Sequence, residues 1–218
     1  MDLTMEEIND RIKREYCANT VSELSDEHLM SQYKECASVK NAIGELEQIL
    51  SARLDESESK QKKISEIVDD YLLKLIPPGT KGVIRGNQFN HIVKRFIHQL
   101  PLDGERFEIC FEKKCMAHFT TEIPDWYILE KSTNRILIGM NQLDLWGGGQ
   151  QLNRGSKYIE NNKHNNEHSK LLCVVCNMIQ FTSKKSKAYK LFEIGFRNNT
   201  LCYLNHLYPI IGSYFHIL

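Results

Sequence analysis

Residues 122–158 read EIPDWYILEKSTNRILIGMNQLDLWGGGQQLNRGSKY, and this stretch decides how the fold is interpreted. A Pro-Asp pair opens a first apolar segment, the turn at 131–134 reverses the chain, and a second apolar segment, 136–140, runs directly into polar residues. Residues that flank the turn of a β-hairpin pair across its strands, so Asp125 should lie beside the polar end of the second strand. The side chains expected there are Asn141, Gln142 and Asp144.

Three glycines, 147–149, follow this polar group and lead into a helix expected at 150–161. Backbone N–H groups at a helix start attract anions, and glycines let a phosphate backbone approach closely. The segment lacks the Gly-Lys-Ser/Thr ending of a nucleotide-binding loop, which argues against ATP or GTP. Carboxylates, amides and a basic helix in this order suit a metal-dependent phosphodiester site, although the glycines also fit a simple tight passage from strand to helix. The side chains available to nucleic acid are Gln150, Gln151, Asn153, Arg154 and Lys157.

The chain has 218 residues, enough to bury a core, and its 28 Lys and Arg balance its 28 Asp and Glu. Overall charge therefore gives no argument for a nucleic-acid partner. The charge distribution does give one, because segment 154–190 is rich in bases and has Glu160 and Glu167 as its acids, which predicts a basic face. The bases are Arg154, Lys157, Lys163, Lys170, Lys184, Lys185, Lys187 and Lys190.

The cysteines and the N-terminus bear on the cellular compartment. Seven cysteines form an odd, scattered set, and the first residues, MDLTMEE, lack the basic and apolar regions of a signal peptide. We therefore expect an intracellular, cytoplasmic protein in a reducing compartment rather than a secreted one. No window approaches the ~20 apolar residues needed to span a bilayer, so no membrane association is expected.

Residues 1–76 are expected to form a helical N-terminal region, a hairpin or an arm, and residues 77–218 an α/β core. Apolar residues in the first region recur at helical spacings, and Ser25 has the context of a helix N-cap. The sequence Pro-Pro-Gly at 77–79 ends the region because it cannot continue a helix. Two interpretations of the region stay open: a dimerisation or DNA-clamping arm, or helices that cover one face of the core.

A mixed sheet flanked by helices is predicted for the core. Strands at 107–113, 123–129 and 135–143 have connections too short for crossovers, so they should form an antiparallel meander. The apolar run 171–176 indicates a strand buried on both faces. The remaining elements expected are a loop that becomes an amphipathic helix within 81–97, a helix at 150–161, a hairpin at 170–196 with its turn at 184–187, and a closing helix at 200–218. Polar residues in 81–97 that face either solvent or the site are Arg85, Asn87, Asn90 and Lys94.

The order helix, three-strand meander, helix, strand, with Pro-Asp opening the second strand, resembles the core of the PD-(D/E)xK nuclease superfamily. More narrowly, it is similar to type II restriction endonucleases, over roughly residues 81–176. The resemblance implies a restriction-endonuclease-like core in which an Asp, a second acid and a lysine converge. The carboxylates hold Mg²⁺, and the metal and the lysine position and activate a water for attack on phosphorus. The first acid corresponds to Asp125.

The second half of the motif departs from the family pattern. If 138–142 aligns with the apolar-Gly-acid-x-Lys segment, Met140 stands at the acid position and Gln142 at the lysine position. Some relatives carry Gln in place of the lysine, but Met does not bind Mg²⁺, a hard cation that takes oxygen ligands. Three alternatives stay open: Asn141 supplies a carbonyl oxygen, Asp144 supplies the carboxylate, or the metal site is lost and the chain binds DNA without cutting it.

Two other constellations compete with this site. Asp103 followed by Glu112-Lys113-Lys114 has the nominal D…ExK spacing, but Asp103 precedes a short loop and the strand alternates like an exposed edge, which favours a surface strand. Cys173 and Cys176 have the spacing of a zinc pair, with two histidines shortly before them. Because these cysteines lie in an apolar run, buried strand cysteines are favoured over a Zn²⁺ site.

The main hypothesis is a Mg²⁺-dependent endodeoxyribonuclease of restriction type that acts on double-stranded DNA. A homodimer is expected, since cutting both strands of a symmetric site calls for two-fold symmetry. Its catalytic residues would be Asp125, Asn141, Gln142 and Asp144, with Asp125 and Asp144 as metal ligands. Its nucleic-acid contacts would be Arg85, Asn87, Gln151, Asn153, Arg154 and Lys157. The alternative hypothesis is a catalytically degenerate protein that grips nucleic acid or a protein partner through the basic segment 154–190.

Overall fold

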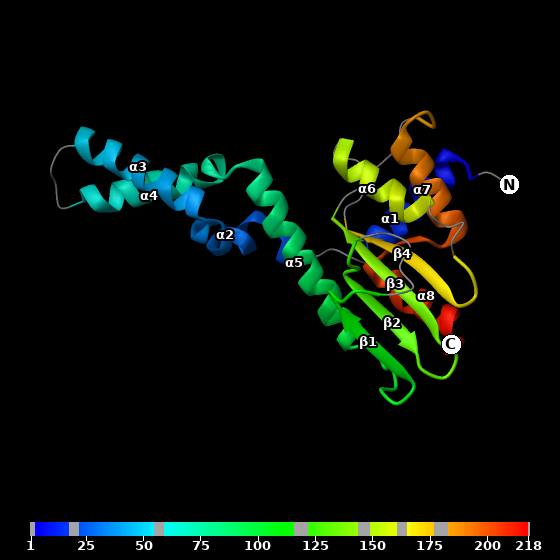
Figure 1. The fold of residues 1–218 in the computed structure, drawn as a ribbon. Helices are drawn as coiled ribbons and strands as arrows, with labels where there is room; N and C mark the ends of the chain where they lie inside the picture. The colour runs from blue at the N-terminus through cyan, green and yellow to red at the C-terminus, as the bar shows by residue number, and fades with distance from the viewer. Residues whose placement is uncertain are drawn as a thin grey trace. The chain divides into compact units, whose positions relative to one another are not determined.

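Figure 1 shows the computed structural model, which describes residues 3–17, 22–54, 59–115, 122–143, 149–160, 165–176 and 183–217. The chain separates into two compact units. The helical unit comprises Val21–Gln88, and the sheet unit comprises Met1–Thr20 together with Phe89–Leu218. The α/β class is the one that the sequence predicts. Within the described ranges, no helix combines the length and the apolar character that a bilayer span requires.

The helical unit contains helices in the region where the sequence predicts them. Its elements are the short 3₁₀ helix η1 (Ser22–Leu24), α2 (Asp26–Glu35), α3 (Ala37–Arg53), α4 (Lys60–Leu75) and the first turns of α5 (Pro78–His98). α3 and α4 pack side by side as the expected hairpin (Figure 1). Apolar side chains from these helices and the α4–α5 junction form one buried cluster: Leu29, Tyr33, Val39, Leu72 and Ile76.

Ser25 caps α2, as its sequence context predicts: Ser25 Oγ accepts a hydrogen bond from the backbone N–H of His28 at 3.2 Å. Ser25→Ala removes this acceptor, so we expect the free energy of opening of α2 to fall by about 1 kcal/mol. Amide hydrogen exchange at His28 and its neighbours measures the loss. Ser31→Ala makes the same chemical change on an exposed position inside α2 and should leave exchange unchanged or slightly slower. Equal effects of the two substitutions would contradict the capping role.

The junction between α4 and α5 differs in part from its prediction. α4 ends at Leu75, just before the Pro-Pro-Gly sequence, as predicted. The prediction that a loop follows this break is wrong, because α5 already begins at Pro78. Proline suits the first position of a helix, since the N–H that it lacks would have no partner there in any case. Gly82 and Gly86 lie next to open space, so within α5 they cost intrinsic helix propensity but no packing.

The sheet unit takes its first helix from the N-terminus. α1 (Met5–Cys17) belongs to this unit, and Ile8 lies fully buried in its core. Tyr189 Oη donates a hydrogen bond to the carbonyl of Leu3 at 2.9 Å. The two units therefore divide near residue 20 and again inside α5 after Gln88, whereas the Pro-Pro-Gly sequence predicts one boundary at 76/77.

One five-stranded sheet forms the centre of this unit, in the order β1-β2-β3-β4-β5. Its strands are β1 (Phe107–Phe111), β2 (Trp126–Glu130), β3 (Arg135–Gln142), β4 (Ser169–Val175) and β5 (Leu201–Tyr203). β1, β2 and β3 pair antiparallel, which confirms the predicted meander, and β4 and β5 continue the sheet in parallel. β4 is buried at every position except Lys170, as its apolar run predicts.

Helices cover both faces of the sheet (Figure 1). α6 (Gly149–Ile159), α7 (Lys187–Asn198) and α1 pack with the side chains of Ile136, Ile138 and Met140 in one apolar core. Successive residues of a strand point to opposite faces, so Leu137, Gly139 and Asn141 point to the other side. That side carries α5 and α8 (Leu207–Phe215).

Two predictions for the C-terminal part are wrong. Within the described residues, the element that follows β4 is α7 rather than a second hairpin strand, because Ser186 Oγ accepts a hydrogen bond from the Tyr189 N–H at 3.1 Å and caps a helix. Segment 200–218, expected as one helix, forms β5 before α8. Asn199, in the left-handed conformation with φ 50°, ends α7 and returns the chain to the sheet.

Candidate functional site

Asp125 lies immediately before β2, and its carboxylate connects three elements of the sheet unit. Asp125 Oδ2 accepts a hydrogen bond from the backbone N–H of Asn141, near the end of β3, at 2.6 Å. Asp125 Oδ1 accepts a second one from Nδ2 of Asn90, on α5, at 3.2 Å. The structure thus brings Asp125 and Asn141 together, as the hairpin geometry predicts, and adds Asn90.

The two asparagines also bind each other. Asn141 Nδ2 donates to Asn90 Oδ1 at 3.1 Å, and Trp126 Nε1 donates to Asn141 Oδ1 at 3.1 Å. Each carboxamide therefore has a partner that distinguishes its oxygen from its nitrogen. We refer to Asp125, Asn90 and Asn141 as the polar cluster. Its oxygens are hard donors of the kind that Mg²⁺ accepts as ligands.

Gly139 makes the position of Trp126 possible. The two residues pair across β2 and β3, and the indole is buried. A Cβ atom on Gly139 would lie 1.8 Å from Trp126 Cε2, far inside van der Waals contact. Packing thus explains the glycine of segment 138–142. Without a side chain it leaves space for the Trp126 indole, which donates a hydrogen bond to the Asn141 carboxamide.

The surroundings of the half-buried Asp125 carboxylate disfavour its negative charge. Burial raises the pKa of Asp125 above its usual value, and the negative charges of Glu112 and Glu122 act in the same direction. The hydrogen bonds from Asn141 and Asn90 oppose this rise. A cation at this position would relieve the cost, because a nearby opposite charge favours the ionised form of a carboxyl group.

Glu112 directly follows β1 and is exposed. It has the left-handed backbone conformation, φ 50°, and its N–H donates to the carbonyl of Asp125 at 3.0 Å. That conformation costs about 1 kcal/mol for a residue with a side chain, and such costs concentrate at functional sites. Glu112 therefore adds a carboxylate next to Asp125 that the Pro-Asp motif does not indicate.

Glu122 connects α6 to the segment that leads into β2. It accepts a hydrogen bond from Tyr158 Oη at 2.5 Å and pairs with Lys157 Nζ at 3.4 Å. The Tyr158 hydrogen bond, more than the charges of Lys157 and Arg154, holds the pKa of Glu122 below its usual value against the effect of burial. This carboxylate is therefore ionised, and it brings the basic side of α6 close to the polar cluster. Its position three residues before Asp125 is the only sequence signal that points to it.

The other predicted catalytic residues have different positions. Gln142 is buried, and as the neighbour of Asn141 in β3 it points to the opposite face of the sheet. Met140, at the family's acid position, lies in the apolar core beneath α6 and α7. Asp144 lies outside the described residues, as do Gly147 and Gly148.

α6 presents most of the described candidates for nucleic-acid contact. Asn153, Arg154 and Lys157 are exposed on this helix, while the side chains of Gln150 and Gln151 lie outside the described part of the chain. Asn153 Oδ1 accepts a hydrogen bond from Lys187 Nζ at 3.0 Å, which joins α6 to α7. Because Lys157 pairs with Glu122, Arg154 is the exposed base of α6 that is best suited to a direct test of DNA contact.

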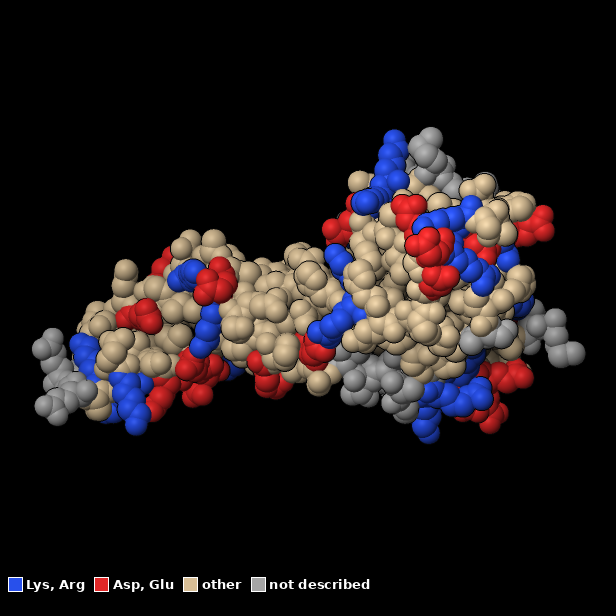
Figure 2. All heavy atoms as spheres, turned by 90° about the horizontal axis from the view of Figure 1, so that it is seen from below, with Lys and Arg blue, Asp and Glu red and all other residues tan. Residues whose placement is uncertain are grey.

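The described bases of segment 154–190 do not all lie on one face of the sheet unit, because Lys170 lies apart from the others. Lys157, Lys187 and Lys190 are exposed, but Lys170 extends from β4 toward the side of the sheet that carries α8. Lys163 falls outside the described ranges. On the face of the molecule shown in Figure 2, Lys and Arg are interspersed with Asp and Glu, in keeping with the net charge of zero.

Arg85 and Asn87, the candidates from the start of α5, belong to the helical unit. Arg85 Nε donates to the carbonyl of Leu24 at 3.0 Å, so its guanidinium helps to attach η1 to α5. Asn87 is exposed. Lys94, further along α5 in the sheet unit, lies 5.1 Å from the centre of the Phe111 ring rather than at the polar cluster.

The described residues of the two competing constellations lie apart from one another or are buried. Asp103 and Glu112 flank β1 at its opposite ends, about 16 Å apart for five strand residues, and Asp103 Oδ1 accepts from the Glu105 N–H in a local turn. Cys173 and Cys176 are both buried, and burial raises the pKa of the Cys173 thiol. A thiol in such surroundings is less ready to ionise and bind a metal.

Comparisons of the chain with protein-family models, with curated proteins and with solved structures each found no match. Among the residues that the structure describes, no three His, Cys, Asp or Glu side chains come together as a metal-binding group.

Proposed function

We propose that the chain is a metal-dependent DNA endonuclease of restriction type on a restriction-endonuclease-like core. The order of elements supports this, since α5, the meander β1-β2-β3, α6 and the parallel strand β4 follow one another as in the PD-(D/E)xK core. The observation that carries the proposal is the Asp125 carboxylate. It is half-buried at the end of the meander, tied to Asn90 and Asn141, at the place where that family has its first metal-binding acid.

The donors at this end of the sheet fit Mg²⁺. Asp125 and the carboxamide oxygen of Asn141 would hold the ion, and Asp144 is the further ligand that the sequence indicates. The raised pKa of Asp125, caused by burial and by the nearby Glu112 and Glu122, supports a cation at this position. A bound cation stabilises the ionised form of such a carboxylate. A bound Mg²⁺ supplies charge neutralisation at the phosphate and lowers the pKa of a bound water.

The residues of the chain itself would position the reaction. Asn90 and Asn141 fix the rotation of the Asp125 carboxylate through their hydrogen bonds, and Trp126 fixes the carboxamide of Asn141. The exposed bases of α6, connected to this end of the sheet through Glu122, would hold the DNA backbone. The homodimer stays part of the proposal, because a symmetric DNA site requires two such clusters.

Arg154→Ala is expected to weaken DNA binding at every sequence and to reduce the salt dependence of affinity by about one unit of slope. The reason is the loss of one phosphate contact. Fluorescence anisotropy with a labelled duplex at several salt concentrations measures both quantities. Lys131→Ala is the matched control, because it removes one exposed base from the β2–β3 turn at the other end of the hairpin. If both variants change the slope equally, α6 is not the DNA surface.

A second candidate function is binding of nucleic acid without cleavage. Two observations favour it: Met140 is buried in the core where the family has an acid, and both carboxylate oxygens of Asp125 already accept hydrogen bonds within the chain. In this case the polar cluster would be a structural network that closes the end of the meander.

Supercoiled plasmid incubated with purified protein, in Mg²⁺ or Mn²⁺ and in EDTA, separates the two candidates. The nuclease predicts metal-dependent nicking or linearisation that EDTA abolishes. The binding module predicts intact plasmid and DNA affinity with a steep salt slope. Protein that neither cuts nor binds varied DNA would refute both.

A further inference from the structure

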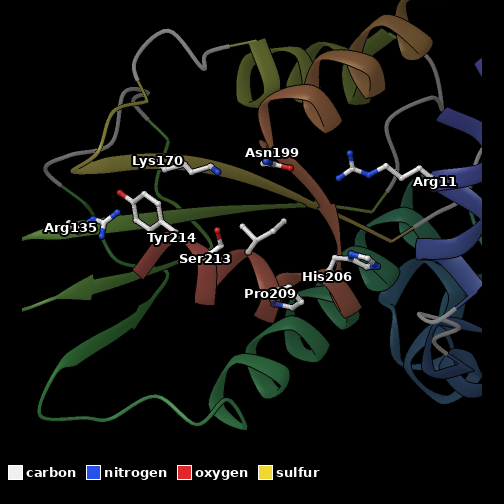
Figure 3. Close-up of a pocket in the computed structure, with 9 residues that line it drawn as sticks. Arg11, Arg135, Lys170, Asn199, His206, Pro209, Ser213 and Tyr214 are labelled. Carbon is white, nitrogen blue, oxygen red and sulfur yellow. The ribbon is translucent and has the colours of Figure 1, made fainter. Parts of the chain in front are cut away.

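We propose that a cationic cavity in the sheet unit, apart from the polar cluster, binds a small organic phosphate. The cavity has a volume of about 430 Å³ and is lined by residues of α1, β3, β4 and the C-terminal segment. Its polar lining includes Arg11, Arg135, Lys170, His206 and the hydroxyls of Ser213 and Tyr214 (Figure 3). No Asp or Glu is among the described residues that line it.

The strand register places this cavity far from the polar cluster. Lys170 pairs with Leu137, two residues after Arg135, so the side chains of Lys170 and Arg135 leave the same face of the sheet. Both lie at the amino ends of β3 and β4. Asn141 is six residues further along β3, roughly 20 Å away. The inference therefore does not depend on the proposed nuclease function.

Lys170 is the lining residue whose charge a bound anion would stabilise most. It is the one position of β4 that is not buried, and the rest of its strand lies in the interior of the sheet. Within the described residues, its ammonium group makes no hydrogen bond or ion pair, and burial lowers the pKa of Lys170. A charged group held in a partly buried position without a partner costs free energy that an anion in the cavity would offset.

Two arginines of the cavity are already held in place. Arg135 Nε donates to the carbonyl of Glu167 at 3.0 Å, and its guanidinium lies 4.8 Å from the centre of the Tyr214 ring. Arg11 Nη1 donates to the carbonyl of Phe196 at 3.1 Å. Figure 3 shows Arg11 and Lys170 directed toward the same part of the cavity from opposite sides. Such preorganised cations lose little conformational freedom when an anion binds.

The charge and the size of the cavity select the class of ligand. Arg11 and Arg135 carry permanent positive charges and Lys170 adds a third basic group, so a single carboxylate would neutralise one charge and leave at least one other. A phosphomonoester carries about −1.5 to −2 charges and three acceptor oxygens on one group. The volume lies within the range of small-molecule sites, ~300–1,000 Å³, and exceeds the space that one inorganic ion fills. An organic phosphate of about nucleotide size satisfies both conditions.

Isothermal titration calorimetry on the full chain, at one fixed ionic strength, tests the proposal with inorganic phosphate, adenosine 5′-monophosphate and succinate. We expect the nucleotide to bind more tightly than phosphate, and succinate to bind at least tenfold more weakly than the nucleotide. Lys170→Met should lower the affinity for the nucleotide at least tenfold, while Lys170→Arg should retain most of it. Lys131→Met is the control for loss of one exposed positive charge and should bind as the wild type does.

Thermal unfolding shows whether a loss of binding in Lys170→Met reflects a loss of folding. Lys170→Met removes a partly buried charge that has no partner among the described residues, so its Tm without ligand should equal or exceed that of the wild type. Wild-type protein that binds neither phosphate nor the nucleotide overturns the proposal. Equal affinity of Lys170→Met and wild type, or equal affinity for succinate and the nucleotide, also overturns it.

Discussion

Asp125→Ala is expected to reduce the proposed DNA cleavage about a thousandfold or more, while the proposed DNA affinity stays within a few-fold of the wild-type value. A factor of a thousand corresponds to about 4 kcal/mol of transition-state stabilisation, the size of effect expected when a metal ligand is lost. Affinity should persist because, in the proposed function, the phosphate contacts come from other residues, Arg154 among them. Single-turnover cleavage with saturating protein, together with anisotropy binding in Ca²⁺ or EDTA, measures the two effects separately.

The control for this experiment is the rival acid at the other end of β1. Asp103→Asn keeps the Asp103 side chain's size and its acceptor for the Glu105 N–H, so it should cleave at the wild-type rate. If Asp103→Asn loses cleavage and Asp125→Ala keeps it, the site lies at Asp103. If Asp125→Ala instead lowers the Tm and the cleavage rate in proportion, the polar cluster is a structural network.

Gly139→Ala should destabilise the sheet unit by about 3 kcal/mol or more, which for a chain of this length lowers Tm by roughly 6–12 °C. The added Cβ would lie 1.8 Å from Trp126 Cε2 and 2.1 Å from Cζ2, and the buried, rigid indole has nowhere to move within a packed core. Displacement of the indole also removes the hydrogen bond to Asn141 Oδ1. Differential scanning calorimetry measures the loss.

Gly82→Ala provides the matched control, since a Cβ at Gly82 meets no atom within 4 Å. The same substitution there should raise stability by up to about 1 kcal/mol through helix propensity. A double-mutant cycle with Trp126→Leu tests the contact itself, because the two substitutions should cost less together than the sum of their separate effects. Additive costs would show that Gly139 is needed for a reason other than the indole.

The sequence predicts the meander and the buried strand β4 because their signals are local. Short connections fix the antiparallel pairing of β1, β2 and β3, and the apolar run at 171–176 leaves no exposed face. α7 was harder to predict, because the bases 184–187 resemble a hairpin turn although Ser186 is a helix cap. The membership of α1 could not be predicted at all, since it depends on contacts such as that between Leu3 and Tyr189, 186 positions apart.

The same distinction applies to the candidate site. Asp125 and Asn141 flank one turn, so hairpin geometry is enough to bring them together. Asn90 belongs to a helix 35 residues earlier, and its choice between solvent and Asp125 depends on how α5 packs on the sheet. The sequence predicts Gln142 as a catalytic neighbour of Asn141, but the two-residue period of a strand turns Gln142 toward the opposite face.

α1 packs against residues that come much later in the sequence, and this affects how the chain folds during its synthesis. Ile8 is buried by a core that includes residues of α7, and Leu3 receives its hydrogen bond from Tyr189. A ribosome that adds about 5–20 residues per second needs roughly 10–40 s to pass from Leu3 to Tyr189. During that interval the apolar side of α1 is on a nascent chain without the residues that will cover it. α1 is therefore synthesised well before the residues that hold it in place, and chaperones that bind short apolar segments have that time in which to act.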